Sequence, residues 1–384
     1  MAGCRYGPRQ IIKFFWAKSM GENKAGKKQG KENMRLELCL WTLLCVGCMA
    51  VMLLFAANKT IVIANVPSDL AGSSEALAEG DPEQGTGLIL QRTSEGNGIF
   101  FIPLPKGTKA ENITVENHYI HGELWLHIEC SDTGFFKENA LTGDTGFIRQ
   151  GSFRIREDGV LLRLKMQRVM EYRSTMKGNT LAVACYEPGE LYDYVVVLDP
   201  AAEGSAGDAV GGQAADAVLS VARMVQKSLS LEGVRIYLTR AEGIELSEED
   251  RLALTEQVGA DLYIGIGVSS DQEDPGRYGI LCYYNREYFI PDFGNVRLAD
   301  LLAREAATAS SNRALGLVPA GGDSLLGSMR IPAAQLSVGY VTNDRERELL
   351  GRAEYQQRLA EGILAALDRA CEELGDVRAD RLAE

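Results

Sequence analysis

Apolar runs of strand length alternate with segments of helical spacing in the second half of the chain. The strand-like runs occupy residues 194–198, 234–238, 262–266, 278–284 and 336–341. Apolar residues at helical spacing cover residues 214–229, 247–258, 296–312 and 345–374. Strands that alternate with helices predict an α/β domain over residues 192–375, with a mostly parallel sheet and flanking helices. Residues 376–384 are expected to form a short tail.

The preceding segment has the period-two pattern of half-buried strands. Its strand-like runs are residues 113–115, 124–128, 153–156, 160–164 and 181–185, separated by Gly and Asp-Gly turn signals. Short strands at this density predict a small all-β sandwich over residues 99–190. Residues 58–98 are rich in Ser, Gly, Glu, Ala and Pro, which is typical of a linker.

The N-terminal part predicts a membrane anchor. Residues 38–57 are apolar and contain no Asp, Glu, Lys, Arg or His. A helix of this length spans roughly 30 Å, the thickness of a bilayer core. Residues 1–35 carry nine Lys and Arg side chains against two Glu, so we expect a basic cytoplasmic arm, one transmembrane helix and an extracytoplasmic bulk. The alternatives are a cleaved signal peptide, a buried helix, or a lipoprotein signal ending at Cys48.

Composition excludes two classes of protein. Of the 384 residues 46% are hydrophobic, which excludes a fully disordered chain. A net charge of −13 argues against nucleic acid as a partner, since phosphate contacts need clustered Lys and Arg.

Cys130 and Cys185 end two predicted strands of one domain and are the candidate disulfide pair. The alternative is that Cys130, Cys185, Cys282 and Cys371 are all buried free thiols.

Four ordered motifs carry a resemblance to a known family. They are Val197-Leu198-Asp199-Pro200, Gly233 to Arg240 (GVRIYLTR), Gly259 to Ile264 (GADLYI), and Ile331 to Asn343 with its Pro-Ala and Val-Gly-Tyr-Val-Thr-Asn segments. In this order they resemble the framework of the zinc-dependent N-acetylmuramoyl-L-alanine amidases, which cut stem peptides from peptidoglycan. The resemblance implies an amidase-like α/β fold.

The chemistry that the resemblance implies has been lost. The family holds zinc with two His and one Glu and uses a further Glu as general base. The matching positions here are Ala202, Ala214, Gly267 and Ser337, and the last histidine of the chain is His127. A catalytic zinc needs about three N, S or O ligands plus an open position for water. We therefore expect no catalytic residue, no metal and no zinc cofactor, and we lean towards a protein that is not an enzyme.

A cleft without its metal can still bind a ligand. The candidate cleft residues are Asp199, Glu203, Arg240, Arg251 and Asn343. Acidic residues near Asp199 could alternatively form an oxygen-only cation site. Arg251 could instead pair with Glu248 or Glu249 on a helix surface, and Asn343 could cap the following helix.

The β-rich segment is similar in strand pattern and domain order to the AMIN domains that precede such amidases. It contains all three histidines, His118, His121 and His127, which could form a metal site or be ordinary strand residues. Trp125 and Tyr119 could form a sugar-stacking face or belong to the core.

The sequence thus predicts a membrane-anchored pseudoenzyme of the amidase family that binds peptidoglycan or a cell-wall enzyme. The first alternative is an active peptidoglycan amidase with an atypical site. The second is a scaffold protein in division or sporulation. The basic N-terminal arm could bind anionic lipid or serve only as a topology signal.

Overall fold

The computed structural model describes residues 61–63, 65–67, 85–201, 209–241, 244–322 and 324–383. The predicted arm at 1–35 and the apolar segment 38–57 lie outside these residues. Among the described helices, none is both long and apolar enough to cross a bilayer. This finding contradicts the predicted single-pass membrane location with a cytoplasmic N-terminus. The longest described helix carries charged residues along its whole length.

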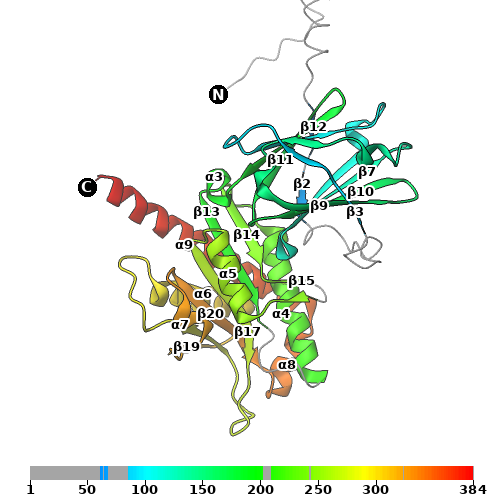
Figure 1. Cartoon of the computed structure of the whole chain (residues 1–384). Coiled ribbons are helices and arrows are strands. Elements are labelled where there is room, and N and C mark those ends of the chain that lie inside the picture. The colour runs from blue at the N-terminus through cyan, green and yellow to red at the C-terminus, as the bar shows by residue number, and fades with distance from the viewer. Residues whose placement is uncertain are drawn as a thin grey trace, which may run out of the picture. The chain divides into compact units, whose positions relative to one another are not determined.

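The first domain is a sandwich of two six-stranded sheets (Figure 1). One sheet has the order β1-β11-β12-β5-β8-β4, with β1 (Ile61–Ile63), β11 (Glu171–Lys177), β12 (Thr180–Tyr186), β5 (Ile99–Pro103), β8 (Leu141–Gly143) and β4 (Leu90–Arg92). The other has the order β2-β6-β7-β10-β9-β3, with β2 (Asn65–Pro67), β6 (Ile113–His118), β7 (Glu123–Glu129), β10 (Gly159–Met166), β9 (Ile148–Ile155) and β3 (Thr86–Gly87). Short 3₁₀ turns lie at Ala110–Asn112, Tyr119–His121, Phe135–Lys137 and Thr145–Phe147.

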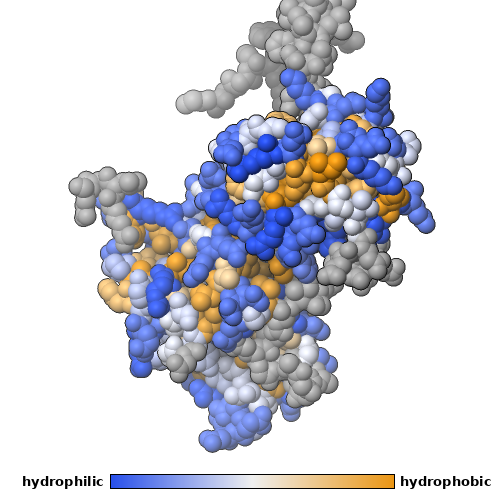
Figure 2. Space-filling view, viewed as in Figure 1, coloured by the Kyte–Doolittle hydropathy of each residue, from blue (hydrophilic) through white to orange (hydrophobic). Residues whose placement is uncertain are grey.

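Both sheets contribute side chains to one apolar core. Phe100 and Val183 come from the first sheet, and Leu126, Phe153 and Leu162 from the second, all less than 3% exposed. The alternating burial of β12 follows the period-two pattern of its sequence. Figure 2 shows an apolar patch over the sandwich on the face in view, among mostly hydrophilic side chains.

The predicted linker at 58–98 supplies the edge strands of this sandwich. β1 and β4 lie at the two edges of the first sheet, and β2 and β3 lie at the two edges of the second. Each is two or three residues long, too short to give a periodic signal in the sequence. They exist as strands because they pair with longer neighbours, for example Ile61–Ile63 with Ser174–Met176. The linker interpretation is corrected accordingly.

The second domain is built on one six-stranded sheet of order β14-β13-β17-β20-β18-β19. Its strands are β14 (Val234–Leu238), β13 (Tyr194–Pro200), β17 (Leu262–Ser269), β20 (Ala333–Tyr340), β18 (Ile280–Tyr284) and β19 (Ala314–Pro319). Four of the pairings are parallel, and β18 runs antiparallel to β20. A separate two-stranded ribbon pairs β15 (Arg240–Ala241) with β16 (Ile244–Glu245).

Helices cover both faces of the sheet, as its continuous apolar strands require. One apolar cluster joins the sheet to α4 (Ala209–Ser228), α6 (Asn295–Ser310) and α9 (Ala353–Ala383). A second cluster on the other face includes α5 (Glu248–Gln257) and α7 (Leu325–Ser328). A short helix, α3 (Pro188–Leu191), precedes β13. The predicted α/β architecture with flanking helices is confirmed.

The end of the chain differs from the prediction. The expected single helix at 345–374 is two helices, α8 (Asp344–Leu350) and α9, which meet at Gly351 and Arg352. Glycine is the weakest helix former after proline, which favours a break at this point. α9 then continues to Ala383, so the residues predicted as a tail are helical.

A buried polar junction links the two domains. Glu171 on β11 accepts hydrogen bonds from Arg235 Nε at 2.8 Å and from the Tyr237 hydroxyl at 2.6 Å, both on β14. The Tyr119 hydroxyl accepts from the Leu238 amide at 2.9 Å and donates to the Leu238 carbonyl at 3.2 Å. Because β14 is an edge strand of its sheet, this hydroxyl satisfies backbone groups that no strand pairs.

Candidate functional site

The carboxyl ends of β13, β17 and β20 bring several predicted site residues together. Gly265 on β17 is paired with Asp199 on β13, and Gly267 is paired with Ser337 on β20. Ligand sites in open α/β sheets form at this end of the strands. Side chains alternate along a strand, so residues 199, 265, 267, 335 and 337 project from the same face of the sheet.

Asp199 is the centre of a buried hydrogen-bond cluster. Its carboxylate is 3% exposed and accepts from Arg251 Nη1 at 2.9 Å. It also accepts short hydrogen bonds from the hydroxyls of Thr239 and Tyr263. Arg251 arrives on α5, whose N-terminus is capped by Ser247. Arg251 therefore pairs with Asp199 inside the domain, where its side chain is buried.

Gly267 and Ser337 form the floor of the site. The Ser337 hydroxyl is buried and lies 2.7 Å from the Ser269 hydroxyl. A β-carbon added to Gly267 would lie 3.3 Å from Nε2 of Gln335. The side chain of Gln335 therefore occupies the space beside the glycine. The floor consists of hydroxyl, carboxamide and backbone groups.

The other predicted site residues are not part of the Asp199 cluster or of the floor. Ala214 is buried on α4, beside a cavity of about 500 Å³ that Arg347 and Gln356 also line. Arg240 donates to the Ala215 carbonyl at 3.1 Å and so ties β15 to α4. Asn343 caps α8 by accepting from the amides of Arg345 and Glu346. Ala202 and Glu203 lie outside the described residues.

Comparison with known proteins finds a match in the second domain. Residues 196–369 match the family model described as N-acetylmuramoyl-L-alanine amidase. We refer to the second domain as the amidase-family domain, after the model that it matches. The match begins within β13 and ends within α9, so it covers the sheet and the site described above.

Curated relatives and solved structures carry the same name. N-acetylmuramoyl-L-alanine amidase CwlM from Mycobacterium tuberculosis is 29% identical over 40% of this chain and 38% of its own length. The germination-specific N-acetylmuramoyl-L-alanine amidase from Bacillus subtilis is 28% identical over 47% of this chain and 81% of its own. The crystal structure of N-acetylmuramoyl-L-alanine amidase from Clostridium difficile 630 is 22% identical, covering 47% of this chain and 97% of that one, with a TM-score of 0.42.

The described residues of the amidase-family domain do not fit a zinc ion. Alanine at 214 and glycine at 267 offer no ligand atom, and the Ser337 hydroxyl is paired with Ser269. The Asp199 oxygens already accept from three donors. Across the described parts of the chain, no group of three or more His, Cys, Asp or Glu side chains is arranged to hold a metal.

Sequence reasoning missed the polar partners of the site in the amidase-family domain. Thr239 and Tyr263 bind Asp199, while Ser269 and Gln335 line the floor. Their spacing carried a usable signal, because residues 263, 267 and 269 share one face of a strand, as do 335 and 337. The motifs drew attention to single family positions instead.

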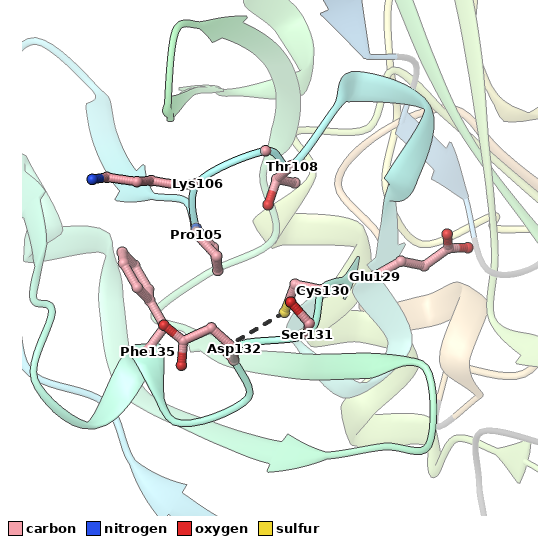
Figure 3. Close-up of a pocket in the computed structure, with 9 residues that line it drawn as sticks. Pro105, Lys106, Thr108, Glu129, Cys130, Ser131, Asp132 and Phe135 are labelled. Atoms are coloured by element: carbon pink, nitrogen blue, oxygen red, sulfur yellow. Dashed lines mark hydrogen bonds between the residues drawn. The ribbon is translucent and has the colours of Figure 1, made fainter.

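The sandwich contains a further cavity of about 350 Å³ (Figure 3). Cys130 and Asp132 line it, and the thiol donates to the Asp132 carbonyl at 3.8 Å. Burial, with a smaller contribution from the Asp132 charge, raises the pKa of this thiol. Thiolates are the reactive form of cysteine, so Cys130 is poorly placed for nucleophilic chemistry.

The predicted Cys130–Cys185 disulfide is absent, because both residues are free thiols. Cys185, Cys282 and Cys371 are buried and Cys130 is partly exposed. Burial raises the pKa of Cys185 to about 12 and that of Cys371 to about 11.

Two of the three histidines pair with different carboxylates. His118 pairs with Glu116 at 2.9 Å, and His127 pairs with Asp158 at 3.0 Å. Trp125 is 9% exposed and lies against the His118 ring, while Tyr119 is 2% exposed at the domain junction. Both aromatic residues are therefore part of the packed interior. This agrees with the alternative that they belong to the core and not with a sugar-stacking face.

Glu123 accepts hydrogen bonds from two neighbouring side chains on the sandwich. Its carboxylate accepts from Trp125 Nε1 at 2.6 Å and from Arg163 at 2.8 Å. Burial by itself would raise the pKa of Glu123, but these hydrogen bonds and the Arg163 charge outweigh it, and the pKa is lowered.

A lowered carboxyl pKa stabilises the folded state above the unfolded pKa and loses that contribution as the pH falls through the folded value. We expect the melting temperature to drop on acidification below pH 4.5. The Glu123→Gln variant should show a shallower drop. Thermal melts between neutral pH and pH 3 measure this, with Glu138→Gln, a change at an exposed residue, as the matched control. Equal slopes for Glu123→Gln and wild type would contradict the expectation.

Proposed function

We propose that this chain is a catalytically inactive homologue of the N-acetylmuramoyl-L-alanine amidases that binds peptidoglycan without cleaving it. The observation that carries the proposal is the pair Gly267 and Ser337 on neighbouring strands. The resembling amidases carry a zinc-ligating His and the general-base Glu at these positions. A glycine cannot bind a metal, and a serine hydroxyl paired with Ser269 has no base to activate it.

The rest of the domain favours a site that still binds a ligand over a site that has lost ligand binding as well. The family match begins within β13 and covers the other five strands of the sheet, and the Asp199 cluster holds the strand ends in a defined arrangement. Such a site can keep ligand contacts from Gln335, Ser337 and backbone groups without chemistry. Peptidoglycan is the ligand class that the family name suggests, since it contains the muramoyl–alanine linkage. The sandwich, which resembles AMIN domains, would assist that binding.

The test combines sedimentation with product analysis. The full chain is incubated with purified bacterial sacculi, pelleted, and the supernatant is analysed for released stem peptides. We expect the chain in the pellet and no peptide release, whereas an active amidase used as a control releases peptides. Peptide release would favour an active enzyme with an atypical site. A chain that stays in the supernatant would contradict peptidoglycan binding and favour a scaffold or a cell-wall enzyme as the partner.

A further inference from the structure

A cavity of about 420 Å³ lies on the sandwich, where the chain leaves three of its strands. Arg92 ends β4, Asp144 follows β8, and Arg168 follows β10. Residues far apart in the sequence therefore line one hollow, and its volume falls within the roughly 300–1,000 Å³ of small-molecule sites. The lining shares no residue with the Asp199 cluster, with the floor beside Gly267 or with the cavity at Cys130.

A buried carboxylate positions one of the two arginines. Asp144 is 1% exposed, and its Oδ2 accepts from the amides of Gly96 at 2.7 Å and Gly98 at 3.3 Å. Its Oδ1 has no hydrogen-bond partner in the described part of the chain and lies 3.5 Å from Arg92 Nη2. A β-carbon at Gly146 would lie 2.9 Å from the guanidinium carbon of Arg92. Asp144 therefore attracts this guanidinium to the cavity wall, and Gly146 leaves room for it.

The guanidinium of Arg92 keeps its hydrogen-bond donors for a ligand. Its side chain is half exposed, and its ion-pair distances are 3.4 Å to Glu95 and 3.5 Å to Asp144. Both distances exceed the roughly 2.7–2.9 Å of a charge-assisted hydrogen bond. Among the described residues, no acceptor meets its N–H groups at hydrogen-bond geometry. The planar fork of Arg92 can therefore receive both oxygens of one carboxylate.

A second arginine and an aromatic ring complete the lining. Arg168 Nη1 pairs with Glu187 at 2.6 Å, and a guanidinium has five N–H donors, so others remain for a ligand. The guanidinium carbon of Arg168 lies 6.0 Å from the ring centroid of Phe147, which also lines the cavity. The ring provides an apolar wall beside two cations.

The charges of the lining suit a ligand with one negative charge. Two guanidinium groups and the Asp144 carboxylate leave the lining residues with one net positive charge. Glu95 and Glu187, the other partners of the arginines, lie outside the lining. Their charges add to that of Asp144, so a doubly charged anion such as phosphate meets more repulsion than a carboxylate does.

We propose that this cavity is a binding site for a small organic monocarboxylate. The ligand carboxylate binds the guanidinium groups of Arg92 and Arg168, and its apolar part lies against Phe147. Asp144 is a positioning residue, which acts through Arg92. The site is separate from the amidase-family domain, so this inference does not depend on the proposed function.

Isothermal titration of the full chain at low ionic strength tests the proposal. The probes are benzoate, benzamide and inorganic phosphate. Benzamide has the shape of benzoate without its charge, and phosphate is the competing oxyanion. We expect benzoate to bind at least about tenfold more tightly than benzamide, a difference of about 1.4 kcal/mol, and more tightly than phosphate. Added NaCl should weaken benzoate binding, since salt screens charges at a half-exposed site.

Three charge-conserving variants assign the binding to this cavity. Arg92→Lys keeps a cation beside Asp144 but lacks the fork, so it should bind benzoate at least about fivefold more weakly at an unchanged melting temperature. Arg168→Lys makes the same change at a half-exposed position and should weaken binding as well. Arg149→Lys changes an exposed arginine of β9 outside the lining and should bind like wild type.

Weaker benzoate binding in either of the two cavity variants, with Arg149→Lys unchanged, would support the site. Four results would overturn it: no measurable benzoate binding, equal affinity for benzamide, tighter binding of phosphate, or wild-type affinity in both Arg92→Lys and Arg168→Lys. Sacculus sedimentation by the same wild-type protein reports on the proposed function separately, because it contains no small carboxylate probe.

Discussion

Replacing Asp199 by alanine should destabilise the amidase-family domain by about 3–5 kcal/mol, because it leaves the buried Arg251 guanidinium without its counter-charge. Thr239 and Tyr263 lose their acceptor in the same step. Whole domains are stable by about 5–15 kcal/mol, so this loss is a large share of the total. Urea unfolding followed by circular dichroism measures it as a lower transition midpoint.

Two further variants define the origin of that loss. Asp368→Ala changes an exposed carboxylate on α9 and should stay within about 0.5 kcal/mol of wild type. The double variant Asp199→Leu with Arg251→Met replaces both charges by apolar groups and should recover part of the stability. If Asp199→Ala unfolds at the wild-type midpoint, the cluster does not stabilise the domain as the structure indicates.

Replacing Glu171 by alanine should weaken the junction between the sandwich and the amidase-family domain. Arg235 and Tyr237 are less than 9% exposed and both donate to this carboxylate. Breaking a buried ion pair by removing one partner costs about 3–5 kcal/mol, since the remaining charge stays buried. We expect the single unfolding transition to separate into two, one for each domain, in differential scanning calorimetry.

The controls for this variant isolate the charge from the hydrogen bonds. Glu157→Ala removes an exposed carboxylate elsewhere on the sandwich and should leave the transition unchanged. Glu171→Gln keeps an acceptor for Arg235 and Tyr237 and should fall between wild type and Glu171→Ala. A Glu171→Ala protein that melts in one transition at the wild-type temperature would show that the junction contributes little.

The sequence revealed the roles of Asp199 and Glu171 to different extents. Asp199 and Arg251 were both predicted as cleft residues, with a helix-surface ion pair as the alternative for Arg251, but their pairing with each other was not predicted. The pairing depends on how α5 crosses the sheet, which no local pattern specifies. Glu171 lies in a strand that had no clear periodic signal, and its partners lie 64 and 66 residues away along the chain.

The candidate site also combines features that the sequence revealed with features that required the structure. The positions of Gly267 and Ser337 could be assigned from motifs, because each motif is a short stretch with its own spacing. That the two lie opposite each other follows from the register of β17 and β20. The place of Gln335 beside Gly265 and Gly267 follows from that register as well.

The sequence by itself determined the alternation of strands and helices in the second domain and which side chains stand at the motif positions. A strand buried on both faces requires a continuous apolar run, and side-chain identity settles whether a ligand atom exists. Only the tertiary structure decided that residues 61–92 provide the four edges of the sandwich and that a carboxamide stands beside Gly267. Those features arise from pairing between segments far apart in the chain, and a strand of two or three residues has no pattern of its own.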